Sequence, residues 1–284
     1  FTDLDIFNDA GAGLRVTSTG ALNAGAGTGF RVAVGAGVST IDSIGGPGVD
    51  INNSSISLPI NFYESTNSTT TGLSLVSAFG GVGGTAFSAS SGLISDPVGA
   101  SGTAVNVSGG NGNITLAIPI TNNSGNSVVV TARTGDTVSF SGAISDTGSG
   151  ISVTTNTGAT INFSGGITNS TGANAAFTAT GGGTVNVTGT NTLTTTTGTA
   201  LNVANTTIGA SGLTFRSISA NGAANGIVLN NTGASAGLTV TGTGGAGTGG
   251  TIQNTTSHGV SLTNTLSPSL TNLTIQNTVG SGVK

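Results

Sequence analysis

The sequence predicts an all-β chain that winds into a right-handed parallel β-helix, a solenoid with three short strands in each coil. A pattern of short apolar segments recurs about every 23–28 residues from about Gly102 onward, and the same residue types return at the same place in each period. No stretch shows sustained helical periodicity, and more than half of the chain is Gly, Ser, Thr or Asn, which are poor or neutral helix formers. A sandwich of antiparallel hairpins also has short, regularly spaced strands, but it gives no reason for identical residue types to return in register.

The first segment of each period has two apolar residues flanking a third residue, and it usually follows a glycine. We expect each copy to form one strand with its flanking pair in the core. The copies are Val105–Val107, Val128–Val130, Ile151–Val153, Leu201–Val203, Ile227–Leu229 and Val260–Leu262.

The second segment places one small polar residue between two large apolar residues. Because side chains alternate along a strand, the polar residues should form one outward column that runs in register along the rod. This predicted outward polar face contains Thr115, Ser139, Asn162, Asn186, Thr214 and Thr239. We expect no second threonine column beside it.

The third segment is a single apolar residue that opens a turn, and an amide usually follows two positions later. The apolar residues are Ile120, Ile144, Ile167, Leu193, Ile218, Ile252 and Ile275. Coils about 4.8 Å apart would stack the following residues, so that their amides bond from coil to coil. The predicted structural ladder consists of Asn122, Asp146, Asn169, Asn254 and Asn277, with Asp146 standing in as an acceptor.

The repeat divides the chain into two parts of one solenoid. Residues 1–100 are expected to form a less regular N-terminal part with longer loops and room for a small cap near residues 61–71, and residues 101–284 to form regular coils. Residues 282–284 repeat the start of a first segment. We therefore expect that the chain continues beyond residue 284 or that another copy stacks on this end.

Composition excludes several classes of function. Charged residues make up 5% of the chain and the formal net charge is −4, so nucleic acid and anionic membrane surfaces are not expected partners. No apolar run reaches the about 20 residues of a membrane span. The chain has no Cys and one His, so we expect no catalytic residues, no cofactor and no metal site.

The few candidate sites have simpler interpretations. Residues 45–50 resemble the opening of a glycine-rich calcium-binding repeat, but no tandem copy follows, so a turn is expected. His258 is expected to be exposed in a turn. Arg133 and Asp136, with Asp146 on the same coil, are expected to form a surface ion pair in a loop rather than a glycan-binding cluster.

The repeats carry a resemblance to known proteins. The segment Gly259–Thr265 followed by Leu273–Asn277, with the columns above, resembles the right-handed parallel β-helices of large bacterial surface and secreted proteins. Autotransporter passengers and filamentous-haemagglutinin-type adhesins are similar in style over about the last two-thirds of the chain. The same scaffold resembles that of pectate lyases, polygalacturonases and phage tailspikes, but this chain lacks their clusters of Asp, Arg and Lys.

The resemblance implies a non-enzymatic structural or adhesive rod, either part of a cell-surface adhesin or a subunit of an extracellular fibre. The implied partners are other copies, joined end to end or laterally, or a surface glycan or protein. One alternative is a polysaccharide lyase or hydrolase on the same scaffold. The other is an ice-binding solenoid, which ranks lower because Ser and Asn interrupt the threonines of the outward face.

Overall fold

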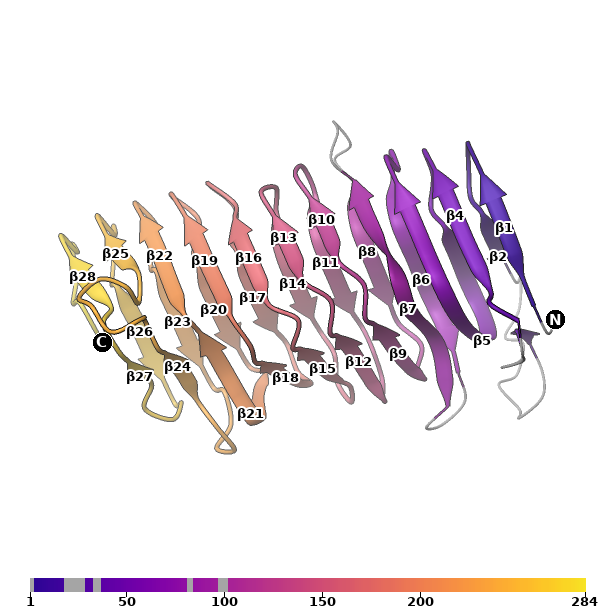
Figure 1. Ribbon diagram of the computed structural model, residues 1–284. Coiled ribbons are helices and arrows are strands. Elements are labelled where there is room, and N and C mark those ends of the chain that lie inside the picture. The colour runs from indigo at the N-terminus through magenta and orange to yellow at the C-terminus, as the bar shows by residue number, and fades with distance from the viewer. Residues whose placement is uncertain (1–2, 18–28, 33–36, 81–83, 97–101) are drawn as a thin grey trace.

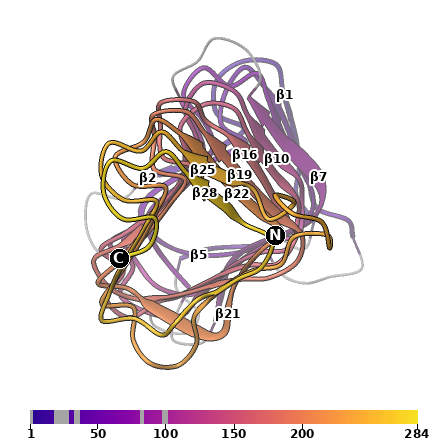
Figure 2. The same cartoon turned by 90° about the vertical axis from the view of Figure 1, so that its left-hand side faces the viewer.

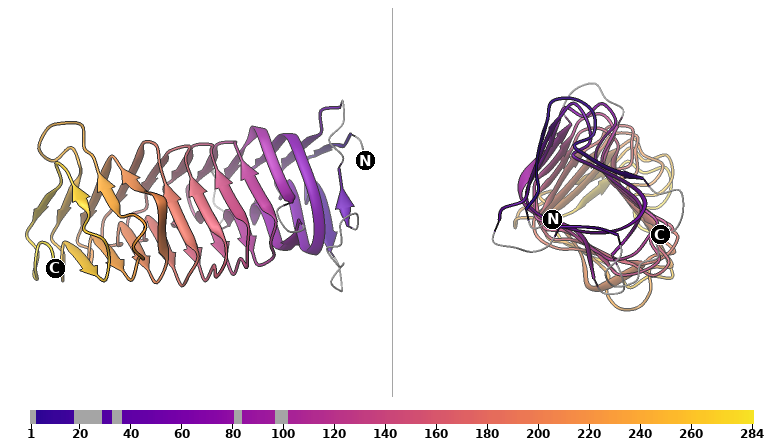
Figure 3. Two further views of the ribbon diagram at one scale, coloured as in Figure 1. Left: turned by 90° about the horizontal axis from the view of Figure 1, so that it is seen from below. Right: turned by 90° about the vertical axis from the view of Figure 1, so that its right-hand side faces the viewer.

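A computed structural model describes residues 3–17, 29–32, 37–80, 84–96 and 102–284. These residues form a parallel β-solenoid of about 9 turns with about 25 residues in each coil, as the sequence predicts. The two ends of the chain lie at opposite ends of the rod (Figures 1 and 3). Figure 2 looks along the axis from the C-terminal end. There the chain runs counter-clockwise from β2 through β5 to β7 as it approaches the viewer, which is a right-handed winding.

The strands stack into three faces, and each strand pairs in parallel with the strands one coil before and after it. The first face contains β2 (Leu14–Thr17), β6 (Thr71–Phe79), β8 (Thr103–Ser108), β11 (Asn126–Thr131), β14 (Gly150–Thr154), β17 (Phe177–Thr180), β20 (Leu201–Ala204), β23 (Ile227–Asn230) and β26 (Val260–Thr263). The second face contains β3 (Phe30–Arg31), β9 (Asn113–Leu116), β12 (Thr137–Phe140), β15 (Thr160–Phe163), β18 (Thr184–Val187), β21 (Thr207–Phe215), β24 (Leu238–Val240) and β27 (Ser269–Leu270).

The third face completes each coil. It contains β1 (Asp5–Asn8), β4 (Thr40–Ile44), β10 (Ile120–Asn122), β13 (Ile144–Asp146), β16 (Ile167–Ser170), β19 (Asn191–Thr195), β22 (Ser217–Asn221), β25 (Thr251–Gln253) and β28 (Thr274–Gln276). Two long strands bend around the rod. β5 (Val49–Thr66) passes over all three faces, and β7 (Thr85–Asp96) passes over the second and third. The N-terminal coils therefore contain the longest strands.

Inward side chains of all three faces form one core. The apolar pairs of the first segment stack in register as predicted, and Phe177 with Ala179 supplies a coil that the sequence pattern missed. Phenylalanines run through the middle of this core. The rings of Phe140 and Phe163 stack at 5.0 Å, and Phe177 meets Phe163 and Phe215 edge-on at 5.4 and 6.2 Å. All four are at most 2% exposed.

The second-segment alignment is wrong at one place. β18 and β21 shift register, because Val185 pairs with Ile208 but Val187 pairs with Leu213. The four residues 209–212 stand opposite the single residue Asn186 and form a bulge on β21. Gly209 fits there because a Cβ would collide with Oδ1 of Asn186.

The third-segment alignment is wrong at two places. Leu193 pairs with Asn169 rather than with Ile167, and Ile252 pairs with Ala220 rather than with Ile218. Each change is a slip of two residues, which keeps the inward and outward faces of the strand unchanged. The core therefore accepts either register, and the apolar residue alone does not identify the stacked position.

The corner after the first face repeats one backbone conformation. From β5 to β26, every coil has a positive φ at the same register position of the first face. This position lies within β5 and β6 and directly follows the strand in the later coils. These residues are Asn53, Ser77, Gly109, Ala132, Thr155, Gly181, Asn205, Asn231 and Asn264. Asn and Gly adopt this left-handed conformation most readily, which explains their frequency at the corner. Backbone hydrogen bonds between neighbouring coils continue through this corner. The N–H of Asn205, for example, donates to the carbonyl of Asn230 at 2.8 Å.

The described ranges contain no helix that is long and apolar enough to cross a bilayer. At the C-terminal end, Val283 pairs in parallel with Val260, so residues 282–284 follow the first-face pattern.

Replacement of Phe177 by Ala should lower the free energy of unfolding by about 3–5 kcal/mol, because it leaves a cavity between two neighbouring rings. Denaturant unfolding followed by circular dichroism measures this loss. Phe7→Ala is the matched control, since Phe7 is 73% exposed and the same change should cost under about 0.5 kcal/mol. Equal losses from the two variants would contradict the proposed role of the aromatic stack.

Candidate functional site

The residues predicted to form the outward polar face fall into two groups on the second face. Thr115, Ser139, Asn162 and Asn186 stand in register on the second face, and Nδ2 of Asn186 donates to Oδ1 of Asn162 at 2.9 Å. Thr214 and Thr239 pair with each other further along. The bulge on β21 displaces this second group from the first, so the six residues do not form one column.

A threonine column does run beside this polar face, so the expectation that none exists is wrong. Successive strands of the second face carry Thr137, Thr160, Thr184 and Thr207 in register. The first three lie two residues before Ser139, Asn162 and Asn186, and Thr207 lies two residues before the bulge. These residues precede the apolar pairs from which the segment was recognised. Their threonine identity, repeated at one place in each period, was the available signal.

The third face carries a longer hydroxyl column that the sequence analysis missed. Its members pair from coil to coil without interruption, and all are exposed or half-buried. They are Thr66, Ser95, Thr121, Ser145, Thr168, Thr192 and Ser217. The strands β10, β13, β16, β19 and β22, which carry most of this column, stand side by side in Figure 1. Glu64 and Arg216 adjoin this hydroxyl column, next to Thr66 and Ser217 at its two ends.

The predicted structural ladder is also divided. Asn122, Asp146 and Asn169 pair in register and are buried. They bond to the backbone of the corner between the third and first faces instead of to one another. Asn122, for example, donates through Nδ2 to the carbonyls of Gly102 and Asn126 at 3.0 and 2.8 Å.

Asn254 and Asn277 belong to a different column. Both are exposed and have a positive φ, and Nδ2 of Asn254 donates to Oδ1 of Asn221 at 2.7 Å. The two-residue slips in the third face separate them from the buried column. The predicted ladder of five residues is therefore wrong as a single unit.

Amide ladders do occur at other exposed positions. Nδ2 of Asn264 donates to Oδ1 of Asn231, and Nδ2 of Asn231 donates to Oδ1 of Asn205, both at 2.9 Å. Nε2 of Gln276 likewise donates to Oε1 of Gln253 at 2.7 Å. In each bond the later coil donates to the earlier one, so the dipoles align along the rod.

Asp146 is the buried acid of the third corner. Its carboxylate accepts the N–H groups of Ser127 and Gly148, both at 2.6 Å. Burial raises the pKa of Asp146 above its ordinary value, and hydrogen bonds from Ser127, Gly148 and Gly150 oppose that rise. Asp146 therefore acts as a structural acceptor, in keeping with its place between two asparagines.

Arg133 is fully buried, so its prediction as a surface charge is wrong. Nη1 and Nη2 donate to the carbonyls of Gly109 and Gly112 on the preceding coil at 2.9 and 2.6 Å, and the N–H of Gly112 donates to Oδ2 of Asp136 at 2.8 Å. Burial lowers the pKa of Arg133 to about 10, and the charge of Asp136 opposes that effect. Arg133 and Asp136 together bind the backbone of the glycine-rich turn at residues 109–112 of the preceding coil.

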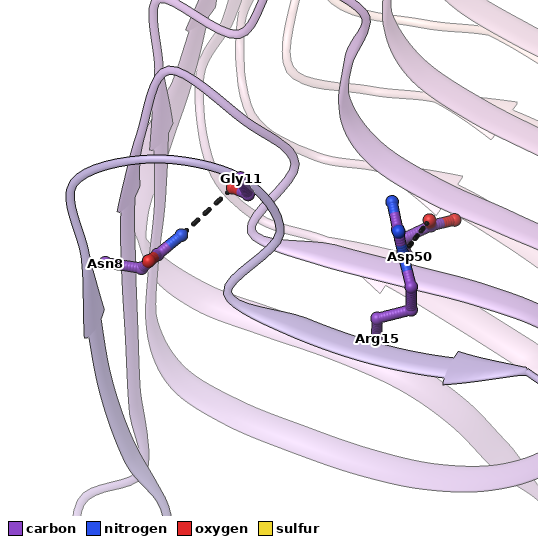
Figure 4. Close-up of polar contacts among 4 residues, drawn as sticks. All are labelled: Asn8, Gly11, Arg15 and Asp50. Atoms are coloured by element: carbon purple, nitrogen blue, oxygen red, sulfur yellow. Dashed lines mark hydrogen bonds and ion pairs between the residues drawn. The ribbon is translucent and has the colours of Figure 1, made fainter.

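The remaining carboxylates lie near the N-terminal end. Asp42 and Glu64 pair in register on the third face, which places two acids on adjacent strands. Asp50 forms an exposed ion pair with Nε of Arg15 at 2.9 Å, and the nearby turn is held by Nδ2 of Asn8 bonding to the Gly11 carbonyl at 3.0 Å (Figure 4). Within the described ranges, no group of three or more His, Cys, Asp or Glu residues could hold a metal ion.

His258 is half-buried in the corner turn before β26. Its Nδ1 accepts the N–H of Ser281 at 2.9 Å, and its own N–H donates to Oδ1 of Asn225 at 3.1 Å. These contacts join three successive coils and give His258 a structural role.

Comparison with known proteins gives no relative. No family model, curated protein or solved structure matches the chain.

The pH dependence of stability tests the state of Asp146. Because its folded-state pKa is raised, Asp146 contributes stability that is present below its unfolded pKa and is lost as the pH rises through the folded pKa. Asp146→Asn removes this contribution and keeps the residue type of the neighbouring coils. Denaturant unfolding measures the free energy of unfolding at about pH 7 and at about pH 3. On going to the lower pH, this free energy should rise more, or fall less, in the wild type than in the variant. Identical pH profiles would contradict this assignment.

Proposed function

We propose that the chain is a rod of an extracellular or cell-surface protein, with a structural or adhesive role and no enzymatic activity. The observation that carries the proposal is the surface of the regular coils. After Asp146 the only charged residues of the sequence are Arg216 and Lys284, and neutral columns of Ser, Thr and Asn cover the strands instead. Ordinary protein surfaces contain far more charge.

This surface suits contact with flat, neutral partners. Self-association is favoured when charge repulsion is small, and each face repeats at the spacing of the coils, so copies of the rod have matching surfaces. Other copies are therefore the first proposed partners, in an end-to-end or lateral arrangement. A surface glycan or protein ligand is the second, and it would assign the rod to an adhesin rather than to a fibre.

The proposal predicts no polysaccharide turnover. The carboxylate of Asp136 accepts the N–H of Gly112, so the enzymatic alternative would rest on the in-register pair Asp42 and Glu64 instead. Neighbouring carboxylates can hydrolyse glycosidic bonds when both face the sugar. We expect the chain to release neither reducing ends nor unsaturated products from neutral and acidic polysaccharides. Turnover that Asp42→Asn or Glu64→Gln abolishes would refute the structural role.

Immunogold electron microscopy of the source cells, with an antibody against this chain, tests where the rod works. Continuous filaments or separate rods at the cell surface would support the proposal and would distinguish a fibre subunit from an adhesin. Labelling confined to the cell interior would refute it.

Ice binding is the second candidate function, because the third face offers the unbroken hydroxyl column described above. Regular neutral hydroxyl groups on a rigid sheet can hold water molecules in a repeating arrangement. One coil supplies matched variants, since Thr178, Thr184 and Thr192 lie on the first, second and third faces and all are half-buried. If the third face binds ice, Thr192→Tyr should abolish inhibition of ice recrystallisation, and Thr178→Tyr and Thr184→Tyr should not. Absence of inhibition by the wild type would exclude this function.

A further inference from the structure

Three Asn–Gly pairs in the sequence carry an intrinsic reactivity. They are Asn111–Gly112, Asn221–Gly222 and Asn225–Gly226. In such a pair the glycine nitrogen can attack the asparagine side-chain carbonyl carbon, a step that glycine favours because no Cβ hinders it. The nitrogen loses its proton to solvent and ammonia leaves, which closes a succinimide. Water then opens the ring to aspartate or isoaspartate.

The solenoid engages all three nucleophilic nitrogens in bonds to the next coil. The N–H of Gly222 donates to the carbonyl of Gln253 at 3.0 Å, and that of Gly226 donates to the carbonyl of Gly259 at 2.9 Å. The N–H of Gly112 instead donates to a side chain, Oδ2 of Asp136, at 2.8 Å. Ring closure requires each nitrogen to leave its acceptor and turn toward the asparagine side chain, so coil stacking suppresses the reaction.

The turn at Asn111 is held on both sides. The guanidinium of Arg133 binds the carbonyls of Gly109 and Gly112, which flank Asn111. Gly112 has a φ of 91°, and a Cβ there would meet Gly80 at 2.6 Å. Oδ1 of Asn111 is buried and has no hydrogen-bond partner. The side-chain carbonyl is therefore unengaged, while the attacking nitrogen is the group that the next coil restrains.

We propose that Asn111–Gly112 is a latent self-modification site that Asp136 of the next coil keeps unreactive. Opening of this coil contact releases the Gly112 nitrogen and starts the reaction. The product adds a negative charge near Asp136, and isoaspartate also lengthens the backbone of a turn that must match its neighbour. A coil that has opened and reacted therefore does not return to the same stacking, which makes local opening irreversible.

The experiment removes the acceptor and uses the other two pairs as internal controls. Asp136→Gly deletes the carboxylate and suits the backbone, because Asp136 has a φ of 62°. Wild type and variant are incubated at mildly alkaline pH, and peptide mass spectrometry measures deamidation at Asn111, Asn221 and Asn225. We expect the variant to deamidate several-fold faster at Asn111 and at the wild-type rate at the other two asparagines. Asp136→Asn, which keeps an acceptor oxygen and tolerates the positive φ, should retain slow deamidation.

A free peptide spanning residues 109–113 sets the unrestrained rate, which the folded wild type should not reach at Asn111. Three results would overturn the proposal. The first is wild-type deamidation at the rate of the peptide, and the second is an unchanged rate in Asp136→Gly. The third is an equal acceleration at all three asparagines, which would show that Asp136 acts only through the stability of the whole rod.

Discussion

Parallel stacking of one coil on the next is the constraint on which the rest of this structure depends. Each residue has its nearest lateral neighbours one coil away, so its side chain must be compatible with the residue above and the residue below. Apolar pairs satisfy this condition by forming continuous columns, and four buried phenylalanines from Phe140 to Phe215 contact one another from coil to coil. The core is continuous along the rod, and the stability of such a solenoid is approximately the sum of contributions from the coils and from the interfaces between neighbouring coils.

The corners meet the same constraint with polar groups. Turning the chain leaves backbone groups that no strand covers, and burial without a partner is costly. Buried side chains satisfy them at two corners: Asn122, Asp146 and Asn169 before the first face, and Arg133 and Asn156 after it. The charged members of these sets are explained by the backbone they satisfy, so neither Arg133 nor Asp146 indicates a chemical function.

Sequence reasoning recovered the features that repeat with the coil. The fold, the first-face strands and the inward pairs follow from apolar residues that return in every period. The register of the third face could not be predicted in this way, because a slip of two residues preserves side-chain direction. From the alternation alone, Leu193 could align with Ile167 or with Asn169, and the structure pairs it with Asn169. The burial of Arg133 could not be predicted either, because its guanidinium binds backbone carbonyls, which every residue has.

The outer surface of the regular coils carries little charge, and this bears on function. A face that avoids charge gives up the usual protection against association, and here the neutral residues stand in columns with the repeat of the coils. Such a surface is compatible with another rod or with an ordered layer of solvent, because both can repeat along the axis. A soluble substrate would need a concave, chemically distinct site instead. The in-register acids Asp42 and Glu64 lie beside each other on adjacent strands of the third face, where both side chains are half-buried. The regular coils therefore favour a role in which the length and repeat of the rod matter more than any single side chain.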